Sequence, residues 1–153
     1  ADILLGLPYH FRILQTKDTL VILHEEMSRR IIPLDGRPHV SAGVPQWLGD
    51  SRGHWEGETL VVETTRFREQ RPLANAFTTA HLRLVERITR IAADEIEYRF
   101  TVDDPTTWQR RWTAVVSIQR SGDVNLYEFA CHEGNHGLPN ILSGARAQEN
   151  GRH

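Results

Sequence analysis

Cysteine and long apolar runs are scarce in this chain of 153 residues, and each shortage excludes a class of protein. Cys131 is the only cysteine, which excludes an internal disulfide and a zinc site built from several cysteines. No apolar run approaches the roughly 20 residues that a helix needs to span a bilayer. We therefore expect no membrane-spanning helix.

A charge excess of either sign is also lacking. The 18 Lys and Arg residues nearly balance the 20 Asp and Glu residues, and the net charge is −2. This balance argues against a nucleic-acid-binding protein, which would carry a basic excess. Lys17 is the only lysine, so nearly every cation is an arginine. The 39% apolar content is typical of a globular protein, and we expect one domain over residues 1–153, with a frayed tail at 148–153.

Short β-like runs separated by turn signals make up most of the chain. The expected hairpins join 12–15 to 19–24, 54–55 to 59–67, 82–91 to 95–102, and 111–119 to 125–131, with a further strand at 30–34. Residues 68–80 are predicted to be irregular or weakly helical, and 139–147 to form a short helix. Eight or nine strands joined mainly by hairpins predict a closed antiparallel sheet, because closure removes exposed edges. The expected fold is mainly β, first a lipocalin-like barrel and second a β-sandwich.

Glu86 is the most informative carboxylate, because the alternation of side chains places it in an apolar row. Leu84, Glu86 and Ile88 share one face of the strand at 82–91. An unpaired carboxylate there would cost several kcal/mol, so Glu86 is expected to be paired, neutral or functional. Pairing with a buried arginine is the structural alternative to a catalytic role, and the abundance of arginine gives the two alternatives about equal weight.

Eight histidines are more than usual, and imidazole suits acid–base chemistry and metal ligation near neutral pH. The densest polar cluster runs from Cys131 to His136 and contains His132 and Glu133. The functional alternatives are metal ligation by His132 and His136 or a nucleophilic Cys131 beside His132, and the structural alternative is a loop that caps one end of a barrel. His39 lies in a long loop, where binding residues are common.

Trp55 is predicted to be a core or rim residue, or part of a stacking floor for a flat ligand. Asp104 follows Asp103 and precedes Pro105, which indicates first a turn with side-chain hydrogen bonds and second a cation site. Glu128 lies in a run with apolar groups on both faces, so alternation does not place it.

Several motifs resemble those of a large uncharacterised bacterial family whose members are often predicted to be exported. The motifs are the runs at 30–39, 49–57, 59–64, 85–87, 102–108 and 128–135, and the resemblance covers about residues 12–146. It implies export and sequence N-terminal to Ala1, but no particular activity. It favours as site residues Asp35, Arg37, His39, Glu86, Asp103, Asp104, Glu128, His132 and Glu133.

The leading hypothesis is therefore an exported enzyme that hydrolyses or eliminates from a polar organic or sugar-like small molecule. Glu86, His39 and His132 are its expected acid–base groups. The expected substrate-binding residues are Arg37, Trp55, Asp104 and Glu128. No cofactor is required, although His132, Glu133 and His39 are an expected divalent-metal set in a second version. The rival hypotheses are a non-catalytic carrier of a small ligand and a structural or assembly protein.

Overall fold

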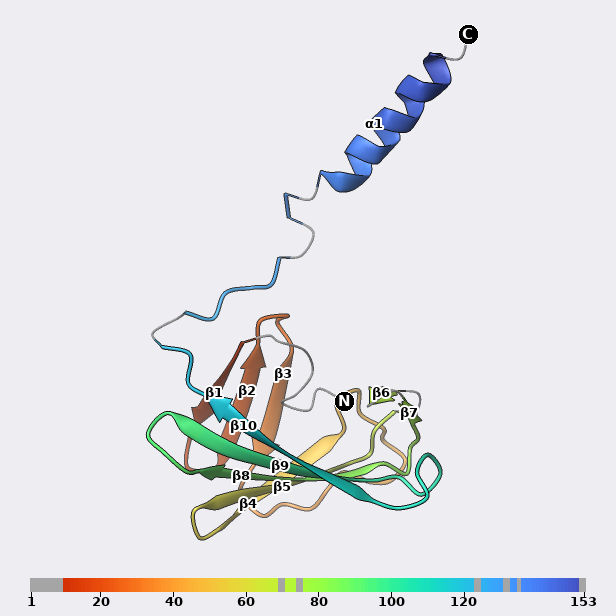
Figure 1. Ribbon diagram of the computed structural model, residues 1–153. Helices are drawn as coiled ribbons and strands as arrows, with labels where there is room; N and C mark the ends of the chain where they lie inside the picture. The colour runs from red at the N-terminus through yellow and green to blue at the C-terminus, as the bar shows by residue number, and fades with distance from the viewer. Residues whose placement is uncertain are drawn as a thin grey trace.

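The computed structural model describes residues 10–68, 71–73, 76–122, 125–130, 133–134 and 136–151. These residues form a mainly β protein with two antiparallel sheets, a short hairpin and a C-terminal helix (Figure 1). The small sheet has the order β1-β2-β3 and the large sheet β10-β9-β8-β5-β4. The elements are β1 (Phe11–Gln15), β2 (Thr19–His24), β3 (Arg29–Pro33), β4 (Asp50–Glu56), β5 (Thr59–Thr65), β6 (Arg71–Leu73), β7 (Ala76–Thr78), β8 (Arg83–Arg90), β9 (Glu95–Asp103), β10 (Trp112–Gln119) and α1 (Gly137–Asn150).

Alternating burial along the strands produces one core between the two sheets. On β9 the side chains of Tyr98, Phe100 and Val102 are buried, whereas Arg99 is exposed, which confirms the predicted period of two. Leu84, Glu86 and Ile88 share the inner face of β8, also as predicted. The small sheet contributes Leu20, Ile22 and Ile32 to the same apolar cluster.

The described strands do not form a closed barrel. β3 and β4 lie side by side but belong to different sheets, and Gly53 on β4 brings its backbone close to the side chains of Ile32 and Leu34. At the other end of the strand order, β1 and β10 are the outermost strands of their sheets. The main strands thus follow the order of a meander that is interrupted at two seams, β3/β4 and β10/β1.

Two expected elements are corrected by the structure. Residues 71–73 and 76–78, expected to be irregular or helical, pair as the hairpin β6–β7. Residues 125–130, expected to pair with the strand at 111–119, have no regular secondary structure, and β10 pairs with β9 instead. The amide of Phe129 donates a hydrogen bond to the Glu25 carbonyl at 2.8 Å, which ties this segment to the end of β2.

The predicted C-terminal helix is present and longer than expected. α1 spans Gly137–Asn150, none of its residues is buried, and it projects from the β-sheet body (Figure 1). In the described part of the chain, no helix has the length and apolar character that crossing a membrane requires.

Candidate functional site

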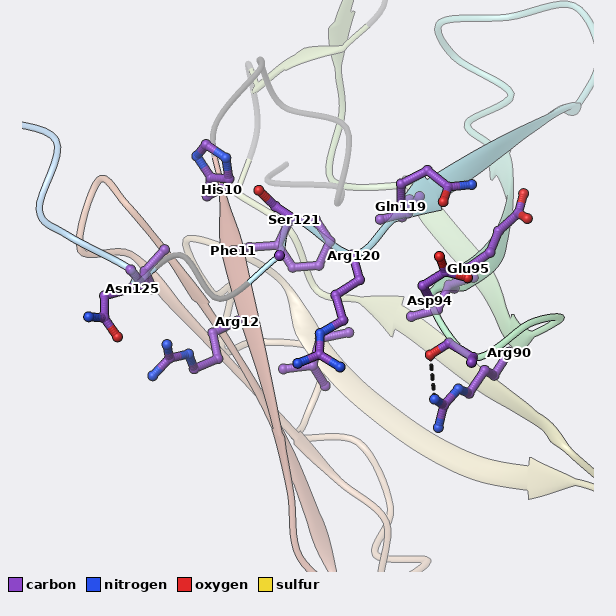
Figure 2. Close-up of a pocket in the computed structure, with 16 residues that line it drawn as sticks. His10, Phe11, Arg12, Arg90, Asp94, Glu95, Gln119, Arg120, Ser121 and Asn125 are labelled. Atoms are coloured by element: carbon purple, nitrogen blue, oxygen red, sulfur yellow. Dashed lines mark hydrogen bonds between the residues drawn. The ribbon is translucent and has the colours of Figure 1, made fainter.

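A cavity of about 870 Å³ lies at the seam between β1 and β10 (Figure 2). It is bounded by the start of β1, the β8–β9 turn, the end of β10 and residues 125–126. We call it the seam cleft. Its apolar lining consists of Phe11, Ile13, Ala93, Ile96, Ile118 and Leu126. Phe11, Ile13, Ile96 and Ile118 are half-buried and pack on the core, so the cleft reaches the apolar interior.

The charged groups of the seam cleft are arranged at its rim. Among the described lining residues, the arginines Arg12, Arg90 and Arg120 outnumber the carboxylates Asp94 and Glu95. Arg90 donates to the carbonyls of Ala92 and Ala93 at 3.1 and 2.5 Å, which fixes its guanidinium on the β8–β9 turn.

Two other rim groups have fixed partners. Ser117 donates to Glu95 at 2.6 Å, which holds that carboxylate on the outer face of β9. His10 at the rim lies 2.9 Å from a Glu25 oxygen through Nδ1, so its ring orientation is set by a carboxylate. Arg12 and Arg120 also line the cleft.

Glu86, the expected catalytic acid, lies instead in a polar cluster inside the core. It is fully buried and accepts a hydrogen bond from Arg30 Nη1 at 2.8 Å, a second from Arg30 Nη2, and one from the Tyr98 hydroxyl at 2.7 Å. Arg30 also donates to Ser51 Oγ at 3.1 Å and to Thr64 Oγ1 at 2.7 Å. This is the pairing with arginine that the structural alternative predicts.

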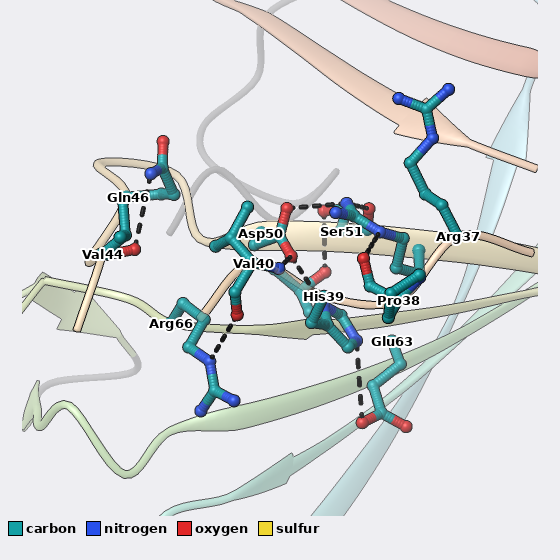
Figure 3. Close-up of polar contacts among 12 residues, drawn as sticks. Arg37, Pro38, His39, Val40, Val44, Gln46, Asp50, Ser51, Glu63 and Arg66 are labelled. Atoms are coloured by element: carbon teal, nitrogen blue, oxygen red, sulfur yellow. Dashed lines mark hydrogen bonds and ion pairs between the residues drawn. The ribbon is translucent and has the colours of Figure 1, made fainter. Parts of the chain in front are cut away.

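His39 is held by a carboxylate on the opposite, outer face of the large sheet (Figure 3). Its Nδ1 lies 2.8 Å from Asp50 Oδ2, and its Nε2 lies 4.0 Å from Glu63 Oε1. The Val40 amide and Arg52 Nη1 donate to the same Asp50 carboxylate at 3.0 and 2.6 Å. The structure therefore brings His39 together with Asp50 and Glu63, and not with Glu86.

Both carboxylates beside His39 are held ionised. Burial alone would raise the pKa of Asp50, but hydrogen bonds from the Val40 amide, His39 and Arg52 outweigh it and lower the pKa below its usual value. The hydrogen bond from Arg83 lowers the pKa of Glu63, against a smaller opposing effect of burial. Asp50 at Nδ1 thus orients the imidazole of His39, and Nε2 is directed towards Glu63.

The other expected site residues lie apart from one another. Arg37 pairs with Asp35 in an exposed turn, and the hydrogen bonds from Arg37 lower the pKa of Asp35 to about 2. Trp55 is 47% exposed near the end of β4. Asp104 is buried and accepts hydrogen bonds from Thr79, Thr106 and Thr107, which is the predicted turn role.

The expected C-terminal site residues lie beyond the sheets. Glu128 and Glu133 are exposed in the segment between β10 and α1, and His132 lies outside the described residues. Within the part of the chain that the structure describes, no three His, Cys, Asp or Glu side chains are grouped so that they would hold a metal ion. The metal set of His132, Glu133 and His39 stays a prediction.

Sequence reasoning missed the seam cleft. Its residues come from β1, the β8–β9 turn and the end of β10, and none belongs to a recognisable motif. A signal was available in the β10 sequence, where Trp112, Ala114, Val116 and Ile118 form an apolar row. Comparison with protein-family models, curated proteins and solved structures found no match to the chain.

Proposed function

We propose that this protein is a carrier of a small amphipathic anion, which binds in the seam cleft. The observation that carries the proposal is a cavity of about 870 Å³ with an apolar lining and a rim rich in arginine. This volume lies in the range of roughly 300–1,000 Å³ that is typical of small-molecule sites. The pairing of Glu86 with Arg30 supports a carrier over an enzyme that uses Glu86.

The chemistry of the lining selects the ligand class. Phe11, Ile96 and Ile118 offer apolar surface that a hydrocarbon or aromatic body would bury, at about 25 cal/mol per Å². Arg12 and Arg120 offer guanidinium groups, which bind carboxylate, sulfonate or phosphate oxygens in a bidentate manner. A molecule with an anionic head and an apolar body satisfies both features.

The fold fits the same proposal. We interpret the strand order β1-β2-β3 followed by β4-β5-β8-β9-β10 as that of an up-and-down barrel opened at two seams. In this interpretation the protein is an open relative of a lipocalin-like barrel, and the ligand enters through the seam between β1 and β10. Closed eight-stranded barrels of this type hold one small ligand in their interior.

The test is binding of two fluorescent probes, the anionic anilinonaphthalene sulfonate and the neutral N-phenylnaphthylamine. We expect saturable binding of both, with the anion bound more tightly. Ile118→Asp places a charge in the cleft and is expected to abolish binding of both probes. Val115→Asp, on the outer face of the same strand, is the matched control, because Val115 is 51% exposed.

The charge at the rim is tested separately. Arg12→Gln is expected to lower the affinity for the anionic probe about tenfold, or about 1.4 kcal/mol, and to leave the affinity for the neutral probe unchanged. Arg99→Gln is the control, because Arg99 pairs with Glu97 on the outer face. Equal binding by the Ile118→Asp and Val115→Asp proteins would show that the probes bind elsewhere, and the proposal would be withdrawn.

A small-molecule enzyme centred on His39 is the second candidate function, and the Asp50–His39 pair is the observation that favours it. A carboxylate at Nδ1 orients the ring, so that Nε2 serves as the base in hydrolysis or elimination. The assay is turnover of nitrophenyl esters and glycosides. His39→Gln should abolish any turnover, whereas His54→Gln, on the exposed part of β4, should not.

A further inference from the structure

The outer face of the small sheet is apolar, although the described part of the chain does not bury it. Residues of β1, β2 and β3 that point away from the core are Leu14, Val21, Leu23, Ile31 and Pro33, and the register places Val21 between Leu14 and Ile31. Ile31 is 55% exposed. Strands that are apolar on both faces are typical of sheets covered on both sides.

Trp47 extends this surface beyond β3. Its side chain is 64% exposed, and with Ile31 and Arg29 it lines a small pocket of about 280 Å³. We call the six apolar residues the outer patch. Leu14, Ile31 and Trp47 are exposed, whereas Val21, Leu23 and Pro33 are half-buried. An apolar surface that includes exposed residues, a pocket and an aromatic side chain is characteristic of an interaction site.

α1 carries a second apolar surface that the structure leaves exposed. Leu138, Ile141, Leu142 and Ala145 follow the spacing i, i+3, i+4, i+7 and therefore share one side of the helix. Ile141 is 69% exposed. Glu149 lies eleven residues after Leu138, close to three helical turns, so it continues the same side at the C-terminal end.

The two surfaces match in length and in charge. From Leu138 to Glu149 the helix rises about 16 Å at 1.5 Å per residue. Outward-facing residues of neighbouring strands form rows across the small sheet, and successive rows are two residues apart along each strand. Three rows therefore span roughly 13 Å along the strands. Arg12, Leu23 and Arg29 form the row at one end, so Glu149 and the negative end of the helix dipole would lie over arginines. The apolar residues of α1 would then cover Val21 and Ile31.

We propose that α1 of one copy of the chain packs on the outer patch of a second copy, and that the exchange is reciprocal. In the structure α1 leads away from its own sheets, and all of its residues are exposed (Figure 1). A two-fold exchange buries both apolar surfaces of both copies in one isologous dimer. The partner is thus the chain itself, and Arg12, at the end of the outer patch, is the residue that this contact shares with the seam cleft.

The test is the mass of the purified chain in solution as a function of concentration, by sedimentation equilibrium. The wild-type chain is expected to be a dimer. Ile31→Glu and Ile141→Glu are each expected to raise the dissociation constant at least tenfold. Val115→Glu on β10 and Ser143→Glu on the far side of α1 are the matched controls and should remain dimers. Circular dichroism confirms that each variant is folded.

Mixing the two disrupted variants separates exchange from docking of α1 on its own chain. The Ile141→Glu protein keeps an intact outer patch and the Ile31→Glu protein keeps an intact α1, so a mixture is expected to form heterodimers through one of the two contacts. Glu149→Arg should weaken the dimer, and Arg29→Glu should restore it. A wild-type monomer at all concentrations, or a mixture that stays monomeric, would overturn the proposal.

Discussion

Glu86 and Arg30 form a two-pronged ion pair in the core, between the inner face of β8 and the facing strand β3. Both side chains are almost completely removed from solvent, and Tyr98, Ser51 and Thr64 occupy further hydrogen-bonding positions of the pair. The network connects the two sheets through polar contacts at the centre of an otherwise apolar cluster. Charges buried in this way are tolerated when each has its partner.

Removal of one member of this pair is predicted to be far more damaging than removal of both. Glu86→Gln leaves the Arg30 charge buried without its counterion and should lower the free energy of unfolding by about 3–5 kcal/mol. The double variant Glu86→Leu with Arg30→Met should lose less than either single variant. Chemical denaturation of the wild-type protein, of Glu86→Gln, of the single variants Glu86→Leu and Arg30→Met, and of the double variant measures this difference. A Glu86→Gln protein as stable as wild type would be inconsistent with the buried pair.

Part of this arrangement was predictable from the sequence. Alternation on β8 placed Glu86 on the inner face, and the abundance of arginine indicated its partner type. The partner itself was not predictable, because Arg30 lies 56 residues away in the chain and on the other sheet. Local spacing rules relate neighbours on one element and do not pair residues across two sheets.

The two wrong secondary-structure predictions also arose because local sequence does not determine long-range pairing. Tyr127 and Phe129 favour β-structure, which predicted a strand at 125–131, yet strand formation depends on an available neighbour and not on propensity alone. Proline is uncommon inside paired strands, but Pro72 lies in the short hairpin β6–β7. The seam cleft exists because β1 and β10 do not pair, and pairing between the first and last strands is a long-range property.

Asp104 is predicted to lower the free energy of unfolding as the pH becomes acidic. Burial alone would raise its pKa, but hydrogen bonds from Thr79, Thr106 and Thr107 outweigh it and lower the pKa of Asp104 below 3.8. Its contribution to stability is therefore present above the unfolded-state pKa and is lost as the pH falls through the lower, folded-state value.

Asp104→Asn tests this dependence. Free energies of unfolding at neutral pH and in the acidic range should differ less in the variant than in the wild-type protein. At neutral pH the variant should be less stable by about 1–3 kcal/mol, because hydrogen bonds to a buried charge are lost. An identical pH dependence in both proteins would assign the acid sensitivity to other carboxylates.

Gly49 is predicted to be required by both its backbone angle and its surroundings. Its φ is +74°, and an added Cβ would lie 2.6 Å from Thr64 Cγ2 and 2.7 Å from the Phe67 ring. Gly57, with φ of +60° and nothing within 4 Å of an added Cβ, is the matched control.

The two alanine variants separate strain from crowding. Gly57→Ala should lower the free energy of unfolding by about 1–2 kcal/mol, because a residue with a side chain is strained in a left-handed backbone conformation. Gly49→Ala should lower the free energy of unfolding by about 1–3 kcal/mol more than Gly57→Ala, because the added methyl group would overpack the core around Phe67. Thermal and chemical unfolding measure both. Equal losses would mean that the space beside Thr64 accommodates a methyl group.

The central claim is that the seam cleft binds an amphipathic anion, and its most direct measurement is a titration of the isotopically labelled chain with decanoate, followed by amide chemical shifts. The account predicts saturable shifts concentrated at Ile13, Ile96 and Ile118, and smaller effects with decanol. Amides beside His39 on the outer face of the large sheet should not move. Shifts that fail to saturate, or that concentrate outside the cleft, would contradict it.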